Sequence, residues 1–273
     1  MQKLLIGALG LTLMGLPAVA APISGGTFMV AAAPSTAIVA KAHAQRVAGN
    51  YGAALAILED AQKKFPGDAA VLYEMAFTYD RRGDYDEALE AIKKAVAADD
   101  SYENQILLAH SLLMVDKYDA AMDLCDKLES HPGRKSADAW SRSELYVVRG
   151  GAQGLKAKRE GVFAMIRYGL GVRKEFEKGV DTDSDNPRAH YTLGRYFLEA
   201  PGAVGGDPKK GTTILAKAAK MDDMDFVIRG WYVRGLIQTN DADAKAQAER
   251  YVKDFSDLPA SKKQFADVYN KAK

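Results

Sequence analysis

The chain has 273 residues, and its 37 basic and 36 acidic side chains leave a formal net charge of +1. A chain this close to neutrality offers no general support for binding to nucleic acids or to anionic membranes. Its single cysteine, Cys125, excludes an intramolecular disulfide. The length suits one large domain or two, although stacked repeats need no second core.

Residues 1–20 have the features of a signal peptide. A basic start at Lys3 precedes an apolar run from Leu4 to Leu16, and Ala18-Val19-Ala20 supplies the small residues of a cleavage site. We expect cleavage after Ala20 and a secreted or periplasmic protein. The alternative is an uncleaved anchor, but the continuous apolar run is shorter than the ~20 residues that a membrane span needs. The chain has no cysteine near position 20, which argues against a lipoprotein. Residues 21–34 are expected to form a flexible lead-in.

Residues 35–133 contain a motif that recurs along the chain. It consists of a glycine, a tyrosine and two alanines, and it returns with an offset of 34 residues (85 − 51 and 95 − 61). This is the period of a tetratricopeptide repeat, a pair of closely packed antiparallel helices. We therefore predict three regular repeats, with Cys125 at a buried core position of the third. The residues of the repeat signature are Gly49, Tyr51, Ala54, Ala61, Pro66, Gly83, Tyr85, Ala88, Ala95, Tyr118 and Ala121.

The third repeat lacks the turn glycine of the first two. The sequence Met114-Val115-Asp116-Lys117 stands in its place. Because glycine adopts the backbone conformations of tight turns without steric cost, we expect this turn to be less tight.

Residues 134–186 break the period, and we expect a longer, irregular helical pair. Six glycines lie between positions 150 and 171. Gly150 and Gly154 are one helical turn apart and would let another helix pack against this face. Glycine costs ~1 kcal/mol relative to alanine inside a helix, so these glycines should have a packing or ligand-binding reason. Residues 35–133 carry 10 basic and 17 acidic side chains and residues 134–180 carry 11 and 5, an asymmetry that could orient a partner or arise from solvated faces.

Residues 187–259 are expected to form two divergent repeats, and residues 260–273 a capping helix with Phe265 and Tyr269 facing inward. An enlarged turn precedes Asp207, the expected N-cap of a helix that starts with Pro208. We expect this turn to pack against the glycine-rich helices around Gly150 and Gly154; the alternative is an exposed tip without a partner. Its candidate functional residues are Pro201, Gly202, Gly205, Gly206 and Asp207.

Part of this region resembles a known family. The run Leu193-Gly194-Arg195-Tyr196-Phe197, followed by Gly205-Gly206-Asp207-Pro208, is similar to the late repeat of the TRAP-transporter-associated tetratricopeptide proteins, the T components. The resemblance covers residues 145–221. It implies a periplasmic all-helical scaffold, able to form oligomers, that cooperates with the solute-binding protein of an organic-anion importer. The chain departs from this pattern because it lacks a lipoprotein cysteine.

Motifs for catalysis or metal binding are incomplete. The segment Lys210-Gly211-Thr212 reverses the order that a phosphate-binding loop requires. The segment Asp181–Asn186 has the acidic spacing of a calcium loop but lacks its sixth-position glycine and twelfth-position glutamate. The four histidines show no spacing typical of metal ligands. We therefore expect no enzyme activity, no cofactor and no metal.

The predicted fold is all-α, a right-handed solenoid of about six helical pairs with a C-terminal capping helix. The first helix of each repeat should line a concave groove, where aromatic residues beside arginines are suitable anchors for a protein segment. An alternative is that Tyr73 and Phe77 simply pack between repeats. The predicted groove residues are Tyr73, Phe77, Arg81, Ile106, His110, Tyr191 and Arg195.

The predicted function is that of a non-enzymatic exported scaffold that binds a partner protein, such as a solute-binding protein or an envelope complex, through this groove. The alternative is a small-solute-binding accessory protein of an envelope transport system. We expect no nucleic-acid partner and no membrane insertion after cleavage, and the architecture is compatible with homo-oligomers.

Overall fold

The computed structural model describes residues 35–273, so the predicted signal peptide and lead-in lie outside the described residues. Fourteen α-helices and no strand occur in this part of the chain. They are α1 (Thr36–Val47), α2 (Tyr51–Lys64), α3 (Ala69–Arg82), α4 (Tyr85–Ala98), α5 (Tyr102–Met114), α6 (Tyr118–Leu128), α7 (Ala139–Glu160), α8 (Val162–Thr182), α9 (Pro187–Glu199), α10 (Pro208–Met221), α11 (Phe226–Gln238), α12 (Ala244–Phe255), α13 (Pro259–Gln264) and α14 (Ala266–Ala272), with short 3-10 helices η1 (Pro132–Lys135) and η2 (Gly202–Val204).

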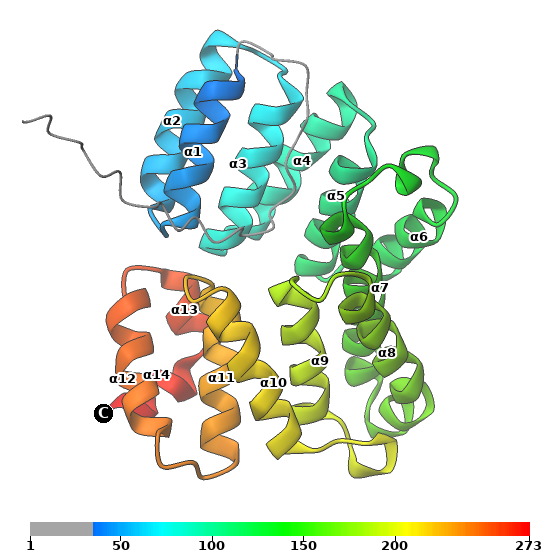
Figure 1. Cartoon of the computed structure of the whole chain (residues 1–273), viewed down its shortest axis with the longest axis vertical. Helices are drawn as coiled ribbons and strands as arrows, with labels where there is room; N and C mark the ends of the chain where they lie inside the picture. The colour runs from blue at the N-terminus through cyan, green and yellow to red at the C-terminus, as the bar shows by residue number, and fades with distance from the viewer. Residues whose placement is uncertain (1–34) are drawn as a thin grey trace, which may run out of the picture.

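Consecutive helices form hairpins that stack side by side (Figure 1). Six pairs run from α1–α2 to α11–α12, and the short helices α13 and α14 complete the chain. The stack curves through α5 to α9, so that α1–α3 come to lie opposite α11–α13. This arrangement confirms the predicted all-α solenoid of hairpins.

The small residues of the repeat signature lie in the core. Ala54 and Ala121 are 0% exposed, and Ala88 is 1% exposed. Because alanine has no side chain beyond Cβ, the facing helices can approach closely at these positions. Cys125 is also fully buried, and burial raises the pKa of its thiol to about 12. Its predicted core position is confirmed, and the thiol is protonated and unreactive at neutral pH.

The turns inside the first three hairpins share one backbone geometry. Gly49 and Gly83 have positive φ angles of 78° and 88°, and Asp116 occupies the same position with a φ of 64°. In each turn the amide of the following residue donates a 2.9 Å hydrogen bond to the carbonyl five residues earlier. The expectation of a looser third turn is therefore wrong. Asp116 adopts the left-handed conformation that glycine takes in the other two, as Asp and Asn do more readily than most residues.

The irregular middle pair consists of the two longest helices, α7 with 22 residues and α8 with 21. Two of the α7 glycines, Gly150 and Gly154, face α8. A Cβ at Gly150 would lie 2.8 Å from Phe176 Cε1, and a Cβ at Gly154 would lie 3.2 Å from Val172 Cγ1. These glycines therefore allow the two long helices to pack closely.

The enlarged turn packs against α8. Asp207 accepts a 3.0 Å hydrogen bond from the Lys210 amide, and Pro208 is the first residue of α10, as predicted. Val204 is 3% exposed, and its Cγ2 would lie 2.9 Å from a Cβ at Gly169 of α8. The expected contact with the two α7 glycines is wrong, because α8 side chains already cover them. The turn is also not an exposed tip.

The predicted single capping helix is instead two short helices that meet at Phe265. This residue is 0% exposed, and its ring centroid lies 6.4 Å from that of Phe226 and 6.2 Å from that of Trp231. A Cβ at Gly230 would lie 2.6 Å from the Phe265 ring. The glycine in α11 thus makes room for the aromatic residue that closes the C-terminal core.

Alanine at Gly83 tests the contact between the two ends of the solenoid. Gly67 and Gly83 both have left-handed φ angles, 80° and 88°. A Cβ at Gly83 would lie 2.4 Å from Ala260 Cβ, whereas nothing lies within 4 Å of one at Gly67. Gly67→Ala should lower the free energy of unfolding by about 1 kcal/mol through backbone strain. Gly83→Ala should lower it by roughly 1–3 kcal/mol more through overpacking. Equal losses in urea unfolding would contradict the contact.

Candidate functional site

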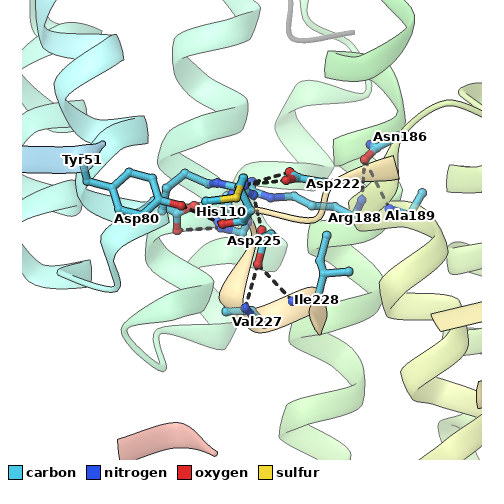
Figure 2. A network of polar contacts seen from close by, with 12 residues as sticks. Tyr51, Asp80, His110, Asn186, Arg188, Ala189, Asp222, Asp225, Val227 and Ile228 are labelled. Carbon is cyan, nitrogen blue, oxygen red and sulfur yellow. Dashed lines mark hydrogen bonds and ion pairs between the residues drawn. The ribbon is translucent and has the colours of Figure 1, made fainter. Parts of the chain in front are cut away.

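The two ends of the solenoid are joined by a buried arginine. Arg81 at the end of α3 pairs with Asp225 and lies 2.8 Å from a carboxylate oxygen of Asp222. Figure 2 shows these two aspartates where the chain enters α11. The Arg81 side chain is 8% exposed and that of Asp225 is 9% exposed. Asp225 also caps α11 by accepting hydrogen bonds from two amides of its first turn. The Tyr51 hydroxyl adds a 2.8 Å hydrogen bond to the Met224 carbonyl.

Asp80, next to Arg81 in sequence, belongs to a polar network that connects the first helices of four hairpins. Nε2 of His110 on α5 lies 3.0 Å from Asp80 Oδ1, and Arg188 on α9 pairs with the other carboxylate oxygen. Arg188 also lies 3.3 Å from Glu144 on α7. Asn186 donates a 2.8 Å hydrogen bond to the same glutamate. One polar network therefore fixes α3, α5, α7 and α9 relative to one another.

The buried charged groups of this network are stabilised by ion pairs and hydrogen bonds with one another. Burial opposes ionisation of Asp80, but His110 and Arg188 outweigh it and hold the pKa of this carboxyl below its usual range. Burial likewise opposes the charge of Arg81, and Asp225 and Asp222 outweigh it and raise the guanidinium pKa. A depressed carboxyl pKa contributes stability above the unfolded value of about 3.9, and the contribution is lost as pH falls toward the folded value. Asp80 and Arg81 are therefore both charged at neutral pH.

A cavity of about 380 Å³ lies inside the curve of the solenoid. The α7–α8 hairpin contributes an apolar wall that includes Leu155, Met165 and Val172, and Gly151 and Gly154 expose backbone there. The charged lining residues are four basic and four acidic: Arg81, Lys158, Arg188 and Arg195 with Asp80, Asp116, Glu199 and Asp225. The lining thus combines apolar surface with a formal charge balance.

Arg195 is one of the predicted anchors that line this cavity. Its side chain is 23% exposed, and it donates hydrogen bonds of 2.8 Å to Glu199 and 3.3 Å to the Tyr191 hydroxyl. Its guanidinium carbon lies 4.3 Å from the Trp231 ring centroid, a cation–π contact. Lys158 lies 2.6 Å from Glu199. Burial opposes ionisation of Glu199, but Arg195 and Lys158 outweigh it and lower the pKa of that carboxyl.

The predicted groove residues divide into two groups. Four of them line the cavity, namely Arg81, His110, Tyr191 and Arg195, as does the loop residue Pro201. The other three pack inside the solenoid. Ile106 is 1% exposed and Tyr73 is 8% exposed, and neither is among the residues that line the cavity.

Phe77 lies between two arginines. The Arg46 guanidinium carbon is 4.2 Å from its ring centroid, and that of Arg188 is 5.1 Å away. The Phe77 ring lies 6.1 Å from that of Tyr73 and 5.7 Å from that of Trp140 on α7. Tyr73 and Phe77 thus pack against each other and between repeats, as the alternative interpretation had it.

Sequence reasoning missed most of the network. A signal was present for Asp225, whose position before Phe226 and the rest of α11 is that of an N-cap. A second was the pair Asp80-Arg81 within an otherwise mainly apolar first helix. Neither indicates a partner, because Arg81 and Asp225 are separated by 144 positions. Arg188 and Glu144 carried no such signal.

Metal and membrane-spanning features are absent from the described residues. In residues 35–273, no group of three or more His, Cys, Asp or Glu side chains is placed to hold a metal ion. Asn186, at the end of the calcium-like segment, is 0% exposed and caps α9 through two amides. None of the helices in this part of the chain combines the length and apolar character that crossing a membrane requires.

Comparisons with known proteins define the repeat type. Two family models, both described as tetratricopeptide repeat, match residues 48–103 and 78–135. The fold is a tetratricopeptide-type solenoid. The regular hairpins of the N-terminal half carry the repeat sequence, and the later hairpins continue the same architecture.

Solved structures of tetratricopeptide proteins share this architecture at low identity. TTC0263 of Thermus thermophilus is 20% identical, with a TM-score of 0.55 over 74% of this chain and 99% of that one. PilW, a type IV pilus biogenesis factor, is 16% identical, with a TM-score of 0.51 over 85% of this chain and 99% of that one.

A third similar structure is the human IFIT1 dimer with m7Gppp-AAAA. It is 13% identical, with a TM-score of 0.57 over 81% of this chain and 48% of that one. Such identities show the fold alone. No curated protein matches the chain significantly in sequence, and the T-component resemblance stays a prediction.

Neutralising Arg81 tests the energetic role of the buried ion pairs. Arg81→Met should lower the free energy of unfolding by roughly 3–5 kcal/mol, because it leaves a buried carboxylate without its partner. Lys63→Met is the matched control: Lys63 lies 3.0 Å from Asp60, but the two side chains are 76% and 70% exposed. The control should lose less than about 1 kcal/mol. Similar losses for both variants in urea unfolding would contradict the role assigned to Arg81.

Proposed function

We propose that the chain is an exported, non-enzymatic tetratricopeptide scaffold that receives part of a partner protein in its central cavity. Tetratricopeptide proteins are generally protein-interaction scaffolds. The observation that carries the proposal is the position of Tyr191 and Arg195, predicted anchors that both line the cavity. Further along the concave face, Arg81 is paired with Asp222 and Asp225 and its side chain is only 8% exposed, against 23% for Arg195. The partner is therefore bound near α9 and not along the entire groove.

The size and charge of the cavity define what enters it. The cavity of about 380 Å³ is in the size range of small-ligand sites, which suits individual side chains of a partner. The charged lining is balanced and the α7–α8 wall is apolar, so apolar or aromatic side chains beside neutral polar groups are the best match.

The proposed location follows from the sequence of the first twenty residues. Lys3, the apolar run and Ala18-Val19-Ala20 form a secretory leader, so the partner is an envelope or secreted protein. The mature chain is then expected to start at Ala21.

A second candidate is a small-solute-binding accessory protein of an envelope transporter. The observation that favours it is the cavity volume, which falls within the roughly 300–1,000 Å³ of small-ligand sites. The T-component resemblance points to an organic-anion importer, whereas the four basic side chains of the lining are already balanced by four acidic ones, with Glu199 pairing with both Arg195 and Lys158. This version therefore favours a neutral or apolar solute over a multiply charged anion.

Site-specific photo-crosslinking tests the scaffold proposal. A photo-reactive residue in place of Met114, which lines the cavity, should give one discrete crosslinked partner when the tagged full chain is expressed in its native host. The same residue in place of Lys63, on the outer face of α2, is the matched control and should not. Arg195→Met should weaken that crosslink severalfold through loss of an anchor. Mass spectrometry of the same preparation should find Ala21 at the N-terminus.

The outcomes separate the two candidates. No crosslink, or the same crosslink from positions 114 and 63, would contradict the scaffold proposal. In a thermal-shift screen, one solute at a hundredfold excess over its Kd adds about 2.7 kcal/mol of stability. A shift that Arg195→Met changes, without any protein crosslink, would establish the solute-binding candidate instead.

A further inference from the structure

The first half of α8 presents an apolar stripe to solvent. Val162 is 54% exposed, Phe163 85%, Ile166 41% and Leu170 56%. Spacing by four residues places Val162, Ile166 and Leu170 on one helix face, with Phe163 at its edge. Together with Tyr168, these are the exposed large hydrophobic side chains of residues 35–273. Their concentration on one helix differs from the single scattered apolar residues of an ordinary surface.

The stripe is flanked by cations without a compensating acid. Residues 161–174 contain three basic side chains and no acidic one. Arg173 pairs with Glu177 at 2.7 Å. Arg167 and Lys174 are exposed and form no ion pair with any described residue. Being seven positions apart, they lie on the same side of the helix, next to the apolar stripe.

The helix that carries the stripe is held firmly on the rim of the solenoid. On the preceding α7, Lys156 lies 2.5 Å from Asp119, Lys158 lies 2.6 Å from Glu199, and Arg159 lies 3.1 Å from Asp116. These ion pairs tie the end of the hairpin to its neighbours on both sides. The enlarged turn packs on α8 at Gly169, beside the stripe. The stripe is therefore presented by an ordered helix.

We infer that this stripe docks the protein onto an anionic membrane surface. An amphipathic helix with Phe, Leu and Ile on one face and Arg and Lys beside it lies in the plane of the lipid interface. The apolar side chains enter the acyl boundary while Arg167 and Lys174 meet lipid phosphates. This is peripheral attachment, independent of the cavity and of any spanning segment.

A second copy of the chain is the less favourable occupant. A two-fold dimer places the same patch of both subunits in contact. It would bring Arg167 and Lys174 close to their counterparts with no acid in residues 161–174 to pair with them, and like charges in an interface are unfavourable. Anionic lipid supplies the missing negative charge.

Vesicle co-sedimentation of the full chain tests the inference. Wild-type protein should bind vesicles of phosphatidylglycerol and phosphatidylcholine more tightly than vesicles of phosphatidylcholine alone. Phe163→Glu should weaken binding roughly tenfold or more by removing apolar burial. Arg167→Gln/Lys174→Gln should lower binding to the anionic vesicles roughly tenfold. Lys262→Gln/Lys263→Gln, the same charge change on exposed positions of α13, is the matched control and should bind like wild type.

The following outcomes would overturn the inference. All proteins share one N-terminus, so any contribution of the leader is common to them, and melting curves should coincide because the altered side chains are exposed. Wild-type protein that does not bind, or Phe163→Glu that binds as well as wild type, would refute membrane docking. So would a control pair that weakens binding as much as the α8 pair. If the wild-type protein does not bind vesicles but forms a dimer that Phe163→Glu dissociates, the stripe contacts a second copy of the chain instead.

Discussion

A buried guanidinium requires carboxylate partners, and Arg81 finds them at Asp222 and Asp225, at the start of α11. Leaving water costs each of these charges several kcal/mol, which only good pairing offsets. The pairing forces the first repeats and the last to face each other across the solenoid. Asp80 extends the same requirement to α5 and α9 through His110 and Arg188. The polar network therefore also fixes the curvature of the stack.

The shape of the functional surfaces follows from that closure. A concave face that closes on itself leaves a cavity instead of an open groove, and the glycines of α7 and the cations of α9 line what remains. The long α7–α8 hairpin forms the apolar wall of the cavity and, on another face of α8, carries the apolar stripe at the rim. The proposed partner recognition in the cavity and the proposed membrane attachment through the α8 stripe are thus compatible on one helix pair.

The sequence predicts the parts of this structure that depend on local spacing. The 34-residue motif gives the hairpins and the buried position of Cys125, and Asp207-Pro208 gives the start of α10. It does not predict the turn at Asp116, because the preference for glycine in left-handed turns is statistical and Asp is tolerated. It also does not predict which residues meet between distant repeats. Its position in the repeat predicts Arg81 as a groove anchor, yet its partners lie 141 and 144 positions away and no periodic pattern connects them.

Hydrogen exchange of the Arg81→Met variant tests most directly whether the buried ion pairs close the solenoid. If they do, amides in the first turn of α11 should exchange faster than in the wild type, together with those at the turn around Gly83. Amides of α6, which packs against α5 and α7 and carries no residue of the polar network, should keep their wild-type protection. Unchanged exchange at the start of α11 would contradict the account, because the two ends would then be held together without Arg81.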